Sequence, residues 1–171
     1  ELSDIRLVSD ATGSGGEHTV VYSYSAGGVV GQSSFDVRHT GALFGLFSTW
    51  AFSTSPLGVI ELTVEHDDHF TANGVDLVTP LQNDDAPYLV FTPGLYEFTH
   101  ESTFLTAEPV RVAVTEPSAA VPAELDVQAN EAFAEQVSVE INEFLDACAT
   151  QQVLLPTGCP FGQSINNRVV T

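Results

Sequence analysis

The chain has 171 residues, 43% of them hydrophobic, and a formal net charge of −19 at pH 7. That hydrophobic fraction is sufficient for a folded core, so the composition excludes a chain that is disordered throughout. The charge comes from 23 acidic residues against four arginines and no lysine, and so negative a surface repels nucleic acids and anionic lipid headgroups. The same acidity would attract cations, keep an exported protein soluble, or suit a salt-adapted organism.

Membrane-spanning and targeting segments are not predicted within these residues. A spanning helix needs about 20 apolar residues, and no run approaches that length. The longest candidate, residues 42–52, is interrupted by Gly45, Ser48 and Thr49 and better suits a buried strand. Any anchoring or targeting segment is therefore expected outside these 171 residues.

Residues 1–116 are predicted to form short strands separated by turns. Eight segments in this region have strand-like composition and lie between turn residues such as glycine, proline and asparagine, and alternation of apolar and polar residues is clearest in 19–25, 47–53 and 59–66. The predicted strands are 19–25, 29–39, 47–53, 59–66, 75–78, 88–91, 95–100 and 110–114. In the third segment, alternation places Phe47 on one face and Trp50 and Phe52 on the other. Short strands with a turn about every ten residues predict a β-sandwich or partial barrel.

Aromatic residues gather in two places in this region. The two groups are Phe44, Phe47, Trp50 and Phe52, and Tyr88, Phe91, Tyr96 and Phe98. Rings exposed on one face would form a carbohydrate- or peptide-binding platform. Core packing is the commoner use of such rings, so it is the favoured interpretation.

Two stretches share the same order of residues. In each, a histidine (His66 or His100) follows an alternating strand and precedes an aromatic residue, a Thr-Ala pair and a second strand. This similarity suggests that residues 1–116 contain two related β units.

The hydrophobic period changes after residue 116. Residues 117–122 are rich in proline and small residues and are predicted to be a linker. From Ala123 to Ala149 apolar residues recur at spacings of three and four, which predicts one amphipathic helix of about seven turns. Residues 123–171 are thus expected to be a helix and a C-terminal arm that begin a further domain, with 164–171 starting another strand.

The two cysteines are Cys148 and Cys159. A four-cysteine metal site and a CxxC redox motif are both absent from the sequence. A structural disulfide is favoured, closing a ring of about 12 residues and contributing roughly 3 kcal/mol by the chain-entropy model. Such a bond indicates an oxidising compartment outside the cytoplasm. Two free cysteines buried in a core are the alternative.

The segment His66-Asp67-Asp68-His69 is the candidate for metal binding. Two imidazoles and two carboxylates suit a divalent ion. However, His66 and His69 face opposite ways on an extended strand, and only a tight turn would bring them together. The favoured interpretation is a solvated hairpin end, so no metal site is predicted.

Catalytic motifs are absent from the sequence. It has no G-x-S-x-G elbow, P-loop or G-x-G-x-x-G segment, and the lack of lysine excludes Schiff-base chemistry. Carboxylate pairs carry little information in so acidic a chain. We predict no catalytic residues, no cofactor and no enzymatic activity.

Residues 91–98 (FTPGLYEF) resemble the PG-x-Y strand-turn of PEGA-like and carboxypeptidase-regulatory-like β modules. In those modules Pro-Gly forms the turn and the tyrosine packs inward. Residues 50–115, with the long helix and the ending Cys148…LPTGCPFG, resemble ectodomains of membrane-anchored proteins of high-GC Gram-positive bacteria. That resemblance implies an extracellular domain held at the membrane by a segment outside these residues, and it brings no catalytic residues.

Together these patterns predict a mainly β fold of small Ig-like or PEGA-like sandwich units, followed by a long C-terminal helix and a disulfide-pinned arm, α+β overall. The predicted function is a non-enzymatic extracellular domain at the cell surface with a structural or interaction role toward a protein or cell-envelope partner. The alternative is a ligand-binding module for divalent cations or glycans. A hydrolase ranks third.

Overall fold

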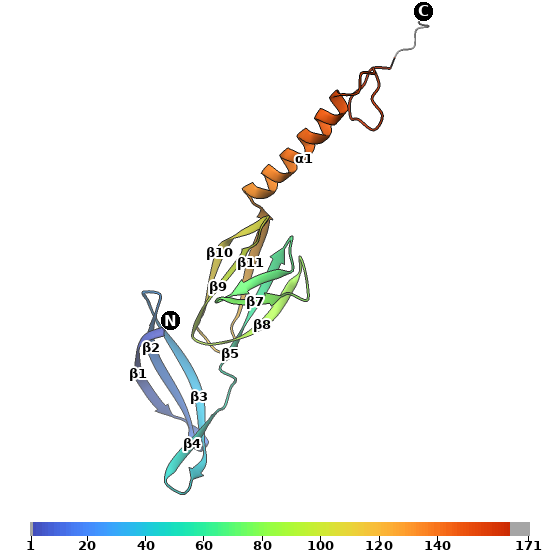
Figure 1. Cartoon of the computed structure of the whole chain (residues 1–171). Coiled ribbons are helices and arrows are strands. Elements are labelled where there is room, and N and C mark those ends of the chain that lie inside the picture. The colour runs from blue at the N-terminus through green and yellow to red at the C-terminus, as the bar shows by residue number, and fades with distance from the viewer. Residues whose placement is uncertain (1, 165–171) are drawn as a thin grey trace, which may run out of the picture. The chain divides into compact units, whose positions relative to one another are not determined.

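The computed structural model describes residues 2–164 (Figure 1). It is mainly β with one C-terminal helix, as the sequence predicts. The strands are β1 (Leu2–Thr12), β2 (Glu17–Ala26), β3 (Val29–Leu43), β4 (Phe47–Phe52), β5 (Leu57–Glu65), β6 (His69–Ala72), β7 (Val75–Val78), β8 (Asp85–Phe91), β9 (Gly94–Glu101), β10 (Leu105–Val114) and β11 (Ala120–Ala129), and the helix is α1 (Glu131–Ala149). The strand predicted over 164–171 lies almost entirely outside the described residues.

The first four strands form an antiparallel meander in the order β1-β2-β3-β4. The predicted turn between β2 and β3 is confirmed, with φ of +56° at Gly27 and +85° at Gly28. A type I′ hairpin turn, whose twist matches that of the strands, needs positive φ at both central residues, and glycine adopts this conformation without strain. This turn fixes the register of β2 against β3, and Val20 therefore lies opposite Phe35.

The other seven strands form one sheet in the order β7-β6-β9-β10-β11-β5-β8. The alternation predicted for residues 59–66 is confirmed in β5, where Ile60, Leu62 and Val64 are fully buried. The sheet curls on itself: Phe70 on β6 meets Tyr88 on β8 with ring centroids 5.7 Å apart, although these strands lie near opposite ends of the order. This curl agrees with the predicted sandwich or partial barrel.

The sequence predicts a linker over residues 117–122 and a helix from Ala123, and both predictions are wrong for residues 120–129. These residues form β11, which pairs in parallel with β5, and the helix begins at Glu131. Leu125 and Val127 are fully buried, while the residues beside them are more exposed. The apolar spacing that suggested a helix therefore includes a period of two, and burial between β10 and β5 decides for the strand.

The helix belongs to a second compact unit, formed by residues 103–105 and those from 129 onward. Asn130 caps its first turn, since its side-chain oxygen accepts a hydrogen bond from the backbone N–H of Phe133 at 3.1 Å. The rings of Phe104 and Phe133 meet edge-on at 6.2 Å. The predicted disulfide joins Cys148 near the helix end to Cys159.

Candidate functional site

A groove lies on one face of the four-stranded sheet and has a volume of about 460 Å³. Every second side chain of a strand points to the same face of the sheet, so all four strands contribute side chains to this groove. Its lining is mostly apolar, with one carboxylate and one imidazole. The lining residues are Leu7, Asp10, His18, Val20, Tyr22, Phe35, Val37, Trp50 and Phe52. We call this surface the aromatic groove.

Several apolar side chains that line the aromatic groove are exposed. Trp50 is 49% exposed, Phe52 52% and Leu7 58%. The aromatic residues of β4 thus lie at the surface, and the core packing favoured from the sequence is wrong for them. Phe47 is exposed as well, but strand alternation places it on the opposite face from Trp50, as predicted.

Asp10 reaches the aromatic groove because β1 contains a bulge. The register runs from Leu7 opposite Tyr22 to Ser9 opposite Val21, so one extra residue, Val8, is inserted in β1. An inserted residue reverses the faces of the residues that follow it. Leu7 and Asp10 consequently line the same groove although three positions separate them.

Hydrogen bonding and ring contacts fix the polar end of the aromatic groove. Asp10 Oδ1 and His18 Nδ1 are 2.8 Å apart. The His18 ring meets Trp50 almost perpendicularly, with centroids 5.0 Å apart, and the His39 ring meets it at 5.4 Å. Trp50 is therefore held between two imidazoles, with a carboxylate bonded to one of them.

The second aromatic group divides between core and surface. Phe98 is buried and Phe91 is 75% exposed. Tyr96 is half-buried and donates a hydrogen bond to the carbonyl oxygen of Phe91 at 2.7 Å. Burial raises the pKa of this phenol. Its ring covers Gly94, where a Cβ atom would approach the ring to 2.6 Å, so Gly94 cannot carry a side chain without displacing the tyrosine.

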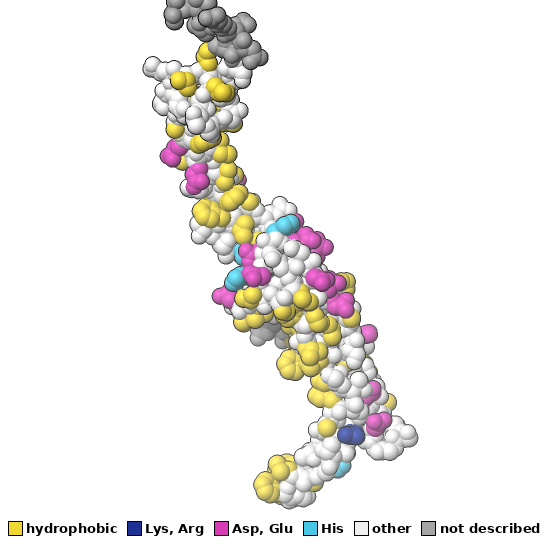
Figure 2. Space-filling view, turned by 90° about the vertical axis from the view of Figure 1, so that its right-hand side faces the viewer, with side chains coloured by type: hydrophobic (Ala, Val, Ile, Leu, Met, Phe, Trp, Pro, Cys, Tyr) yellow, Lys and Arg dark blue, Asp and Glu magenta, His cyan; other side chains and the backbone are white. Residues whose placement is uncertain are grey.

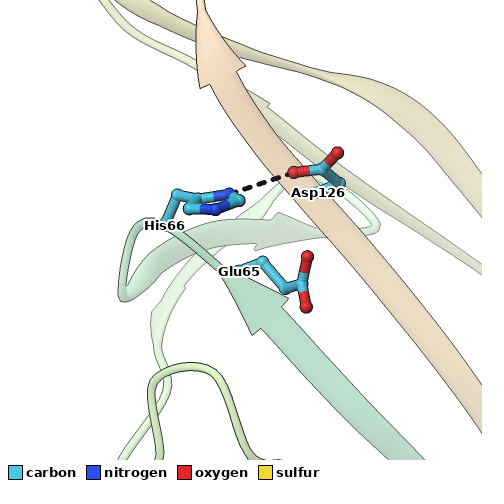
Figure 3. Close-up of side chains that lie close together, drawn as sticks. All are labelled: Glu65, His66 and Asp126. Atoms are coloured by element: carbon cyan, nitrogen blue, oxygen red, sulfur yellow. Dashed lines mark hydrogen bonds and ion pairs between the residues drawn. The ribbon is translucent and has the colours of Figure 1, made fainter.

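The structure separates the two histidines of the segment 66–69. His66 follows the last residue of β5, and its Nδ1 lies 3.1 Å from Asp126 Oδ1 on β11 (Figure 3). Glu65 lies opposite Asp126 in the parallel register. Together Glu65, His66 and Asp126 bring three potential ligand atoms within 4.8 Å of one another.

His69 forms a different group with the two aspartates of the turn. Its Nδ1 lies 2.6 Å from Asp68 Oδ1 and 3.3 Å from Asp67 Oδ1. The backbone N–H of His69 donates to Asp67 at 2.7 Å, and this bond is the main reason why the pKa of Asp67 is lowered. The four residues thus do not converge on one site. They divide instead into two groups, each of which places one histidine beside carboxylates at the surface.

Carboxylates also follow the outward face of β5, β11 and β8. A shallow hollow of about 290 Å³ there is lined by Glu61, Thr63, Asp85, Pro122, Ala123 and Glu124. Figure 2 shows acidic, histidine and hydrophobic side chains side by side over the middle of the view, with a further group of hydrophobic side chains at the lower tip of the chain.

The sequence did not single out Asp10, His18 or His39, because only strand pairing brings them beside Trp50. The available signal was the alternation of residues 47–53, which placed Trp50 and Phe52 on one face. The partners on β1 and β2 depend on a bulge and a register that alternation alone does not specify.

Comparisons with known proteins return no match: no family model, no curated protein and no solved structure resembles the chain significantly. Among the described residues, no helix has both the length and the apolar character needed to cross a membrane.

Proposed function

We propose that this chain is a non-enzymatic extracellular interaction module, and that the aromatic groove is its contact surface. The observation that carries the proposal is the groove itself, which four strands build from side chains such as Leu7, Trp50 and Phe52 that remain about half exposed. Exposed apolar residues that gather on one face mark binding sites more often than isolated ones do.

The Cys148–Cys159 disulfide supports the extracellular part of the proposal. Disulfides persist in oxidising compartments and are rare in reducing ones. The resemblance of residues 50–115 and the C-terminal arm to bacterial ectodomains extends the proposal to a membrane-anchored protein at the cell surface. The absence of catalytic motifs in the sequence supports a binding role over a chemical one.

The contact surface is tested by sedimenting the purified protein with isolated cell envelopes of the source organism. We expect wild type to sediment, Trp50→Ala to stay in the supernatant and Phe47→Ala to behave as wild type. Phe47 is a matched control because it is an exposed aromatic residue on the same strand but the opposite face. Sedimentation that does not depend on Trp50, or none at all, would overturn the proposal.

The compartment is tested separately by mass spectrometry of protein recovered from its native host. Thiols are alkylated under denaturing conditions with and without prior reduction. Cysteines that react only after reduction support the extracellular assignment, whereas free reaction of both cysteines contradicts it.

A further inference from the structure

We propose that the aromatic groove binds an uncharged glycan, a chain of β-linked pyranose rings. This inference rests on the proposed function, since it names the ligand of the same surface. It is supported by the rings of the groove, its polar pair, the net charge of the chain and the placement of the lining residues on paired strands.

The rings of the aromatic groove suit the apolar face of a sugar. A pyranose with equatorial substituents presents C–H bonds on its flat faces, and these carry a partial positive charge that matches the negative face of an aromatic ring. Phe35 and Phe52 meet at 5.9 Å, and Trp50 lies on the same face of β4 as Phe52. The volume of about 460 Å³ is within the range of small-ligand sites, about 300–1,000 Å³.

The Asp10–His18 pair favours a sugar over a purely apolar ligand. An apolar ligand that covered the groove would remove the Asp10 carboxylate from water without replacing its hydrogen bonds, which is unfavourable. Sugar hydroxyls donate hydrogen bonds to a carboxylate, and such charge-assisted bonds are strong. The side chain of Asp10 is 48% exposed, so its carboxylate remains accessible beside the bond to His18.

The charge of the chain argues against two ligand classes. At −19, it opposes binding of anionic polymers and also pairing with a second copy of the same chain, whereas it would attract cations, so the choice of a sugar depends on the rings and on Asp10. Uncharged sugars are not subject to this repulsion. A proline-rich peptide could stack on the same rings, but its proline residues have no backbone N–H and so it offers fewer donors for Asp10 than a sugar does.

The groove is also ordered before a ligand arrives. Trp50 is confined between His18 and His39, and the other lining residues stand on paired strands. A site whose rings are already placed loses less conformational entropy on binding. A β-linked chain is an extended ribbon, and its shape matches an open groove on a sheet better than the helical shape of an α-linked chain.

Trp50 is the only tryptophan in the chain, so its fluorescence reports on the aromatic groove directly. The experiment titrates the intact protein with a β-1,4-linked N-acetylglucosamine tetramer, a β-1,4-linked glucose tetramer and, for comparison, an α-1,4-linked glucose tetramer and a proline-rich peptide. We expect a saturable change in Trp50 emission with at least one β-linked tetramer and weaker binding of the α-linked one.

Variants are measured by calorimetry with the better β-linked tetramer. Asp10→Ala and Trp50→Ala should each weaken binding at least tenfold, about 1.4 kcal/mol. Phe47→Ala should bind as wild type. Circular dichroism of each variant shows whether it is folded, and Trp50→Phe is the conservative replacement if Trp50→Ala does not fold.

The outcomes separate this inference from the proposed function. The titration extends to about 10 mM tetramer, a concentration that would nearly saturate a site with a Kd of about 1 mM. If neither β-linked tetramer binds at that concentration, the glycan inference is overturned. Binding of the proline-rich peptide alone overturns it as well. In both cases the proposed function stands if envelope sedimentation still depends on Trp50, and it fails with the inference if that dependence is absent.

Discussion

Leu7 and Asp10 line the same groove although they are three residues apart on one extended strand. The bulge at Val8 accounts for this. In a regular strand Leu7 and Asp10 would lie on opposite faces, and the extra residue places Asp10 on the same face as Leu7. The carboxylate then lies within hydrogen-bonding distance of His18, and through His18 it lies next to Trp50. A small irregularity in β1 thus converts an apolar sheet face into a surface with a polar end.

Leu125 should be among the residues most important for stability. Its side chain is fully buried on β11, and we expect Leu125→Ala to lower the free energy of unfolding by about 2–5 kcal/mol. Chemical denaturation followed by circular dichroism measures the change. Glu124→Ala, on the neighbouring and exposed position of the same strand, should change stability much less. Similar effects of the two substitutions would contradict the inward orientation of Leu125.

Asp67 should make stability depend on acidic pH. Because its pKa is lowered in the folded state, the ionised carboxylate stabilises the fold above the unfolded value of about 3.9, and this contribution is lost as the pH falls through the lower folded value. Asp67→Ala should therefore have a lower Tm than wild type at pH 7, and the difference should vanish in strong acid. A difference in Tm that stays constant from pH 7 to strong acid would refute this role of the charge.

The substitution Asp67→Asn offers a sharper comparison at the same position. The amide oxygen of the new side chain can still accept the hydrogen bond from the backbone of His69, but the side chain no longer titrates. We expect this variant to be more stable than Asp67→Ala at pH 7 and to show less dependence of Tm on pH than wild type.

Asn130 should contribute to the start of the helix. Asn130→Ala removes the side-chain oxygen that accepts from Phe133, and we expect a loss of about 1 kcal/mol in the stability of the helical unit. Asn130→Asp keeps the acceptor, although it loses the bond that the amide donates to the carbonyl oxygen of Thr103. Helix content during thermal unfolding should rank wild type first, then Asn130→Asp, then Asn130→Ala. An aspartate variant as unstable as the alanine variant would argue against capping.

The Cys148–Cys159 bond should protect the segment that it encloses. Reduction, or replacement of both cysteines by serine, releases residues 149–158, in which Val153, Leu154 and Leu155 are exposed. We expect new cleavage there by a protease that cuts after leucine, while most of α1 keeps its helical signal. Resistance equal to that of the oxidised protein would mean that other contacts hold the segment.

The sequence predicts strands well where a single face is buried. In β5 the alternation of Ile60, Leu62 and Val64 with polar residues has one structural solution, and the predicted bounds differ from the observed ones by two residues at most. The turn residues Gly27 and Gly28 were likewise sufficient to predict a hairpin, because few other residues adopt their backbone conformation.

The strands β1, β6 and β11 were not predicted, and each has a physical reason. β1 is interrupted by two irregularities that break its alternation, and β6 has only four residues. β11 contains a proline, and its apolar residues continue into those of the helix with a spacing that also fits a helix. Its conformation is decided by burial between β10 and β5, and β5 is distant from it in the sequence. The groove could not be predicted for the same reason, since it requires pairings that local sequence does not encode.

The two histidine-containing stretches show how similar local sequences can be used differently. In the first stretch, which contains His66, β5 and β6 are not neighbours in the sheet. In the second stretch, which contains His100, the corresponding strands β9 and β10 pair with each other. His100 is also buried and bonded to the carbonyl oxygen of His69, while His66 is exposed. Their environments, and hence their roles, differ.

The position of β11 has a consequence for synthesis of the chain. The strand lies between β10 and β5, so those two strands have no partner on their facing edges until residues 120–129 leave the ribosome. The seven-stranded sheet should therefore be completed late, after all its other strands have been made. A chain that is truncated after residue 116 would omit a central strand, and it should aggregate through the two open edges.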